Sequence, residues 1–116
     1  MPTILDGLPA SEGIASGKVF LLDWGVPVVP HRSIKSEEAK AEVARFQEAR
    51  DWARERLSEI MARTEERLGT VEARIFEPQI LMLDDPAVVD GTVRYIEENN
   101  LSAERAFEWR MLELKA

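Results

Sequence analysis

The chain has 116 residues, of which 45% are apolar and 32% charged, and its net charge at pH 7 is −7. This length allows one domain, or a small domain with part of another. The acidic balance argues against nucleic acid as a partner, and no apolar run approaches the roughly 20 residues of a membrane span. The absence of cysteine excludes disulfides and cysteine-ligated zinc, and with no secretory leader pattern the expected location is the cytoplasm.

Residues 1–32 are predicted to be one strand followed by a linker. Gly7, Gly13 and Gly17 are separated by small and turn-forming residues, and the apolar segment 18–22 that follows is typical of a buried strand. A strand needs a neighbour for its backbone hydrogen bonds, and the rest of the chain offers none. The neighbour is therefore expected in another copy of the chain or beyond its last residue.

Residues 33–116 have the pattern of packed helices. Ser36 is a candidate N-cap for a long helix of about 30 residues, which Gly69 ends. Apolar residues at steps of three, four and seven give this helix a single apolar seam, which comprises Val43, Phe46, Ala53, Leu57, Ile60 and Thr64.

Three further helical segments are expected after Gly69. Thr70 can cap the first of them, and a kink or break is predicted at 77–79 because a proline lies in its middle. The pair 85–86, an aspartate before a proline, predicts the start of the next helix, and Ser102 caps the last. That last helix carries no stop signal before Ala116, so the bundle is expected to be truncated there.

The apolar run 80–83 cannot face one core from a single side of a helix. Part of it is therefore expected to be exposed on the broken helix. Two explanations stay open: a docking patch for a partner, or a surface that a further part of the bundle covers. Without other information, the second is favoured.

The sequence predicts no metal site, cofactor site or catalytic residue within this chain. His31, the single histidine, follows a proline in the linker and lacks glycine-rich neighbours, which indicates a surface residue. Asp84 and Asp85 are more simply explained by helix capping than by cation binding. The glycines do not have the spacing of a phosphate-binding loop.

The glycine-rich opening, 7–22, and the block 75–86 resemble the N-terminal part of enzyme I, the phosphoenolpyruvate-protein phosphotransferase of the bacterial sugar phosphotransferase system. The resemblance covers nearly the whole chain. It implies a mainly α fold, in which 33–116 form the helical docking domain for the phosphocarrier HPr. It also implies that 1–32 belong to a phosphohistidine domain whose remainder follows the helices.

The resemblance further implies that the intact enzyme, a homodimer, passes a phosphoryl group from phosphoenolpyruvate through its own histidine to HPr during sugar uptake. The family's histidine lies in a Gly-Gly-x-x-Ser-His type motif, which this chain lacks, so the chain alone is expected to be inactive. Phosphoenolpyruvate and magnesium ion would be bound by a distal barrel domain.

The family's docking positions carry over to the second and third helices. They imply HPr contacts at Ile75, Gln79, Met82 and Leu83, with Arg74 and Asp84 as weaker candidates. Where family members often place acids at the start of these two helices, this chain has Thr70 and Val71 in one and Pro86 and Ala87 in the other. The acidic match to a basic HPr is thus diluted, which leaves room for a less charged carrier.

Other functions also fit this sequence. The chain could be a free-standing helical interaction module that docks another protein, or a paralogue of enzyme I that serves nitrogen regulation or a dihydroxyacetone kinase. In any of these cases the unpaired strand and the exposed apolar surface predict self-association of the chain.

Overall fold

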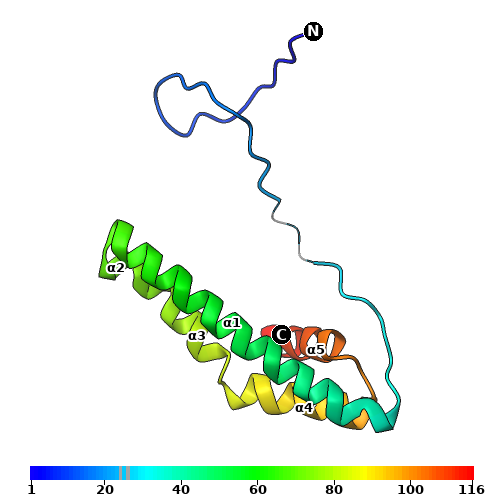
Figure 1. Cartoon of the computed structure of the whole chain (residues 1–116). Coiled ribbons are helices and arrows are strands. Elements are labelled where there is room, and N and C mark those ends of the chain that lie inside the picture. Colours follow the sequence, from blue (N-terminus) through cyan, green and yellow to red (C-terminus); the bar gives the residue numbers. More distant parts are fainter. Residues whose placement is uncertain (24, 26) are drawn as a thin grey trace.

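The protein is described here by a computed structural model that covers residues 1–23, 25 and 27–116. It is mainly helical, as the sequence predicts, and Figure 1 shows α1 running along both the broken α2–α3 segment and α4, with α5 crossing it. The elements in chain order are η1 (Ser36–Glu38), α1 (Ala39–Leu68), α2 (Thr70–Ala73), η2 (Arg74–Phe76), α3 (Glu77–Met82), α4 (Pro86–Asn99) and α5 (Ala103–Lys115).

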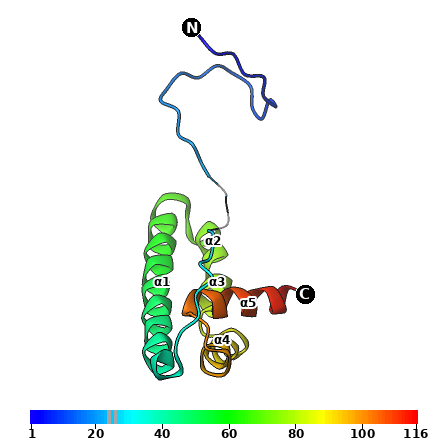
Figure 2. The same cartoon turned by 90° about the vertical axis from the view of Figure 1, so that its right-hand side faces the viewer.

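The described residues before Arg32, which are 1–23, 25 and 27–31, form an extended N-terminal arm that leads away from the helices (Figures 1 and 2). The predicted strand at 18–22 is not formed: this segment has no regular structure, and Val19, Phe20 and Leu21 are at least 85% exposed. The physical reason is that its backbone finds no neighbouring strand to pair with. The predicted linker includes Trp24 and Val26, which lie outside the described residues.

The root of the arm is fixed to the turn between α4 and α5. The backbone N–H of Ile34 donates to the carbonyl of Asn100 at 2.9 Å, and the N–H of Ser102 donates to the carbonyl of Arg32 at 3.2 Å. These two bonds enclose an isolated antiparallel bridge between Ser33 and Leu101. Residues 32–34 are therefore tied to the helical unit.

The long helix α1 ends where the sequence predicts, but its start differs because the short turn η1 precedes it. Lys35, not Ser36, is the N-cap of η1, and its backbone N–H donates to the Glu38 carboxylate at 2.7 Å. The N-cap of α1 itself is Glu38. At the other end Gly69 takes a φ of 105°, which glycine adopts without steric cost. Its backbone N–H donates to the carbonyl of Glu65 at 3.0 Å.

The break in the second helix lies earlier than predicted. The irregular turn is η2, at Arg74–Phe76, whereas Pro78 sits in the first turn of α3, where a missing N–H is tolerated. The nitrogen of Pro78 has no hydrogen to donate to the carbonyl of Arg74 one helical turn before it. The backbone therefore forms the tighter 3-10 turn η2 at this point. Thr70 is the first residue of α2 rather than its cap, which is Gly69.

The caps of the last two helices are confirmed. The carboxylate of Asp85 accepts from the N–H of Ala87 at 2.8 Å, with Pro86 as the first residue of α4. The hydroxyl of Ser102 accepts from the N–H of Arg105 at 3.4 Å at the start of α5.

The core lies where the first half of α1 meets α4 and α5. Its buried cluster consists of Ile34, Ala39, Phe46, Ile96, Ala103 and Ala106. The α2–α3 segment packs on the second half of α1 through Ala73, which is fully buried. No helix within the described ranges is both long enough and apolar enough to cross a membrane.

Candidate functional site

Three of the six predicted contact residues lie along one exposed side of the broken helix. Ile75 is 66% exposed, Met82 is 43% exposed, and Gln79 between them is also exposed. Their spacing of four and then three residues keeps them on the same helical face. Val71, one turn before Ile75, extends this face and is exposed as well. We call these four residues the exposed stripe.

The exposed stripe alternates along the segment with residues that are withdrawn from solvent. Ala73 is buried, Phe76 and Ile80 are half-buried, and the segment as a whole packs against α1. The family resemblance implied the stripe's last three residues as contacts but not Val71, which was noted only as a departure from the acids that family members often have there. Its regular spacing from Ile75 was the signal that could have identified it.

Leu83 and Asp84 are held by α1 instead. The carbonyl of Leu83 accepts from the Nε of Arg50 at 2.7 Å. The carboxylate of Asp84 accepts from the Nη2 of Arg50 at 2.8 Å and also from the guanidinium of Arg54. The structure therefore separates these two predicted residues from the exposed stripe.

Arg74 lies beside the stripe in η2. Its side chain is exposed, and its Nε is 3.4 Å from the carboxylate of Glu77 in the next turn. Its charge is thus partly balanced by a residue of the same segment.

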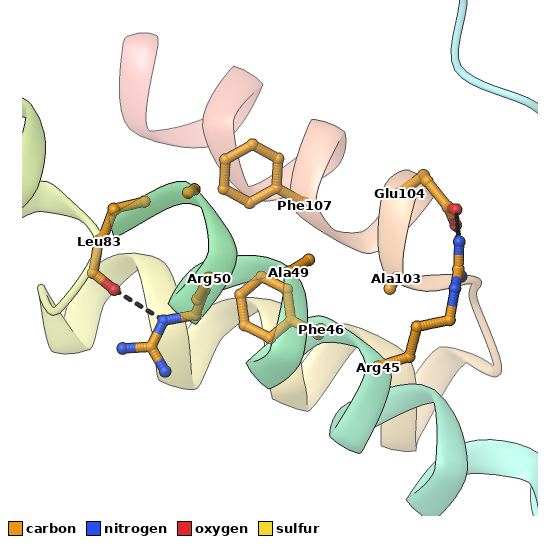
Figure 3. Close-up of a pocket in the computed structure, with 9 residues that line it drawn as sticks. Arg45, Phe46, Ala49, Arg50, Leu83, Ala103, Glu104 and Phe107 are labelled. Atoms are coloured by element: carbon orange, nitrogen blue, oxygen red, sulfur yellow. Dashed lines mark hydrogen bonds and ion pairs between the residues drawn. The ribbon is translucent and has the colours of Figure 1, made fainter. Parts of the chain in front are cut away.

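A second surface feature is an apolar groove of about 280 Å³ between α1 and α5 (Figure 3). Phe46 from α1 and Phe107 from α5 face each other across it, with ring centroids 6.3 Å apart. The other residues that line it are Arg45, Ala49, Arg50, Ala53, Leu83, Ala103 and Glu104. The sequence did not predict this groove because its two aromatic walls are far apart in the chain.

An ion pair between Arg45 and Glu104 closes one end of the groove. The Nη1 of Arg45 is 3.1 Å from one carboxylate oxygen of Glu104, and its Nη2 also contacts that carboxylate. These hydrogen bonds from Arg45 lower the pKa of Glu104 to about 2 and raise the pKa of Arg45. Both groups therefore stay charged at neutral pH.

Asp84 and Asp85, the two neighbouring acids of this region, both accept hydrogen bonds within the chain. Asp84 is paired with two arginines and Asp85 caps α4, so neither presents a free carboxylate pair to a magnesium ion. Across 1–23, 25 and 27–116, no three or more histidine, aspartate or glutamate side chains gather in a way that could hold a metal. His31 is exposed in the arm.

Comparison with known proteins places the chain in a family. The model of the family described as "PEP-utilising enzyme, N-terminal" matches residues 6–116, almost the whole chain. The chain belongs to this family.

The phosphoenolpyruvate-protein phosphotransferase of Haemophilus influenzae is 35% identical over 100 residues, which is 86% of this chain and 17% of that protein. The enzyme of the same name from Enterococcus faecalis is 31% identical over 108 residues, which is 93% of this chain and 18% of that protein. The chain thus spans less than a fifth of the length of these relatives.

A solved structure shares the fold. The NMR solution structure of an Enzyme I protein (nEIt) superimposes with a TM-score of 0.71 at 21% sequence identity, and the match covers 75% of this chain and 35% of that one. Together with the family match, this similarity confirms the predicted resemblance to the N-terminal part of enzyme I.

Proposed function

We propose that this chain is the docking part of a phosphoenolpyruvate-protein phosphotransferase and that it binds an HPr-like phosphocarrier protein through the exposed stripe. The observation that carries the proposal is the exposure of Ile75 and Met82 on one helical face of a chain that belongs to this family. Exposed apolar anchors on helical segments suit a partner that buries them on binding.

In the intact protein the chain would position the carrier. Phosphoryl transfer between two histidines depends on holding donor and acceptor in line, and a docking surface supplies that orientation. The chemistry itself would come from a histidine outside this chain, and phosphoenolpyruvate and magnesium ion would bind in another domain. The proposed setting is the cytoplasm, and the proposed pathway is sugar uptake.

Because the reacting histidine is proposed to lie outside this chain, the chain alone is predicted not to transfer phosphate. Its single histidine, His31, lies exposed in the arm. Phosphorylation of the isolated chain by phosphoenolpyruvate would contradict the proposal.

Calorimetric titration with unphosphorylated HPr of the same organism tests the proposal. Ile75→Ala and Met82→Ala are each expected to weaken binding about tenfold, because each removes an apolar anchor. Trp52→Ala is a matched control: Trp52 is 67% exposed, close to the 66% of Ile75, but its neighbours in the adjacent surface depression all come from α1.

Two results would overturn the proposal. One is the absence of HPr binding by a chain whose circular dichroism shows it to be folded. The other is an equal loss of affinity in the Trp52 variant and the stripe variants, which would mean that the stripe is not the contact surface.

A further inference from the structure

The segment from α2 to α3 is attached to α1 in a different way at each end. At its beginning Ala73 is fully buried. At its other end α3 has little apolar anchoring, because none of its residues Glu77–Met82, all within the described part of the chain, is buried. The hydrogen bonds that tie this end to α1 come from the next two residues, Leu83 and Asp84.

Arg50 of α1 makes most of these bonds, and its guanidinium is held in a fixed place. Its Nε donates to the carbonyl of Leu83 at 2.7 Å (Figure 3), and its Nη2 donates to the carboxylate of Asp84 at 2.8 Å. Its Nη1 donates to the side-chain oxygen of Gln47, one turn earlier in α1. The side chain is only 15% exposed, and the guanidinium carbon lies 6.0 Å from the ring centroid of Phe46. Each of the three nitrogens thus has its own acceptor.

The bond to Leu83 holds the backbone itself. Leu83 is the C-cap of α3, and carbonyls at the end of a helix have no acceptor role left within the helix. Because Leu83 directly follows Met82, the last residue of the exposed stripe, a fixed carbonyl at Leu83 also constrains the place of Met82. Arg54 adds a second contact to Asp84, but its side chain is more exposed than that of Arg50.

From this arrangement we infer that Arg50 is a positioning residue for the proposed docking surface: it sets the orientation of α3 against α1 and thereby places Met82 relative to Ile75. The inference rests on the proposed function. It assigns Leu83 and Asp84, which the family resemblance implies as carrier contacts, to an attachment within the chain. A surface whose parts are already in place loses less conformational freedom on binding, so the attachment contributes to affinity without a contact between Arg50 and the carrier.

The first measurement needs no carrier. Residual dipolar couplings of the isotope-labelled full chain report the orientation of α3 relative to α1. In Arg50→Met this orientation is expected to change or to become averaged by motion, whereas the orientation of α4 relative to α1 is expected to stay as in the wild type. An unchanged orientation of α3 in the variant would overturn the inference and leave the proposed function intact.

The second measurement is calorimetric titration of the same proteins with HPr of the same organism. Arg50→Met is expected to weaken binding about tenfold. Arg50→Lys keeps the charge but concentrates its donors at one point, so it is expected to weaken binding about threefold. The matched control is Gly91→Ala, which brings a methyl group against Arg110 where α4 meets α5 and is expected to leave the dissociation constant within about twofold of the wild type.

The outcomes separate the inference from the proposed function. Wild-type affinity in Arg50→Met, or an equal loss in Arg50→Met and Gly91→Ala, would overturn the inference alone. If circular dichroism shows that Arg50→Met does not fold, Arg50→Lys takes its place in both measurements, and wild-type affinity in that variant would overturn the inference. No binding of HPr by the folded wild-type chain would overturn the proposed function, and the inference with it.

Discussion

The carboxylate of Glu42, in the first turn of α1, accepts a hydrogen bond at 2.8 Å from the backbone N–H of Ala103, the first residue of α5. The same oxygen accepts from Arg45 at 2.7 Å and from Arg32, at the root of the arm, at 3.1 Å. The side chain of Glu42 is only 9% exposed. One buried acid thus joins three segments that are distant in the sequence.

Glu42→Ala is expected to lower the free energy of unfolding by about 2–4 kcal/mol, because it leaves the buried N–H of Ala103 and the guanidinium of Arg32 without this acceptor. Urea denaturation followed by circular dichroism measures the change. Glu42→Gln keeps a carbonyl acceptor in place and is expected to cost less. A loss below about 0.5 kcal/mol in the alanine variant would show that water replaces the carboxylate there.

Because Gly91 in α4 has no side chain, the side chain of Arg110 from α5 can lie directly against the backbone of α4. A methyl group at Gly91 would overlap the guanidinium of Arg110, whose Nε donates to the carbonyl of Ala87 at 2.5 Å. Gly91→Ala is expected to destabilise the fold by about 1–2 kcal/mol, although alanine is the better helix former. In an Arg110→Ala background the same change is expected to be neutral or stabilising by up to about 1 kcal/mol. Equal costs in both backgrounds would rule out the clash.

Glu104 makes stability depend on pH through its ion pair with Arg45. Its pKa is lowered from 4.5 to about 2 in the folded chain, chiefly by hydrogen bonding to Arg45, so the folded state favours the ionised form. The stabilisation is therefore complete above pH 4.5 and is lost as the pH falls toward 2.

Measurement of unfolding free energy against pH for the wild type and Glu104→Gln checks this effect. The stability difference between the two proteins is expected to shift against the wild type as the pH falls through that window. If the stability difference between the two proteins does not change with pH, Arg45 does not pair with the Glu104 carboxylate in solution. Glu108→Gln, also in α5, is a control from a different ion pair.

The segment 18–22 is expected to drive self-association. Val19, Phe20 and Leu21 are exposed, and their backbone groups lack strand partners, as in an unprotected sheet edge. Light scattering is expected to show species larger than a monomer at high protein concentration, and Phe20→Glu is expected to reduce them. Val28→Glu, equally exposed but outside the segment, is the control. A wild-type monomer at every concentration would contradict this expectation.

The sequence predicts best those features that a few neighbouring residues determine. The end of α1 at Gly69 and the caps Asp85 and Ser102 follow from local backbone chemistry, and the structure confirms them. The break near Pro78 was predicted in kind but misplaced, since the proline acts on the carbonyl one turn before it.

Features that depend on distant parts of the chain could not be predicted in this way. The segment 18–22 has strand-like composition, but a strand forms only where a neighbour exists. The attachment of Leu83 and Asp84 to Arg50 joins residues more than 30 positions apart, which no periodic pattern reveals. Three residues of the exposed stripe, Ile75, Gln79 and Met82, were named from the family resemblance, and their local spacing explains why they share one exposed side.

The measurement that tests the central claim most directly is an NMR titration of isotope-labelled chain with unphosphorylated HPr of the same organism. Backbone amide shifts are expected to cluster on Val71, Ile75, Gln79 and Met82, with little change around Trp52 on α1. Shifts confined to other surfaces, or no shifts at saturating HPr with a folded chain, would contradict the claim that the exposed stripe docks the carrier.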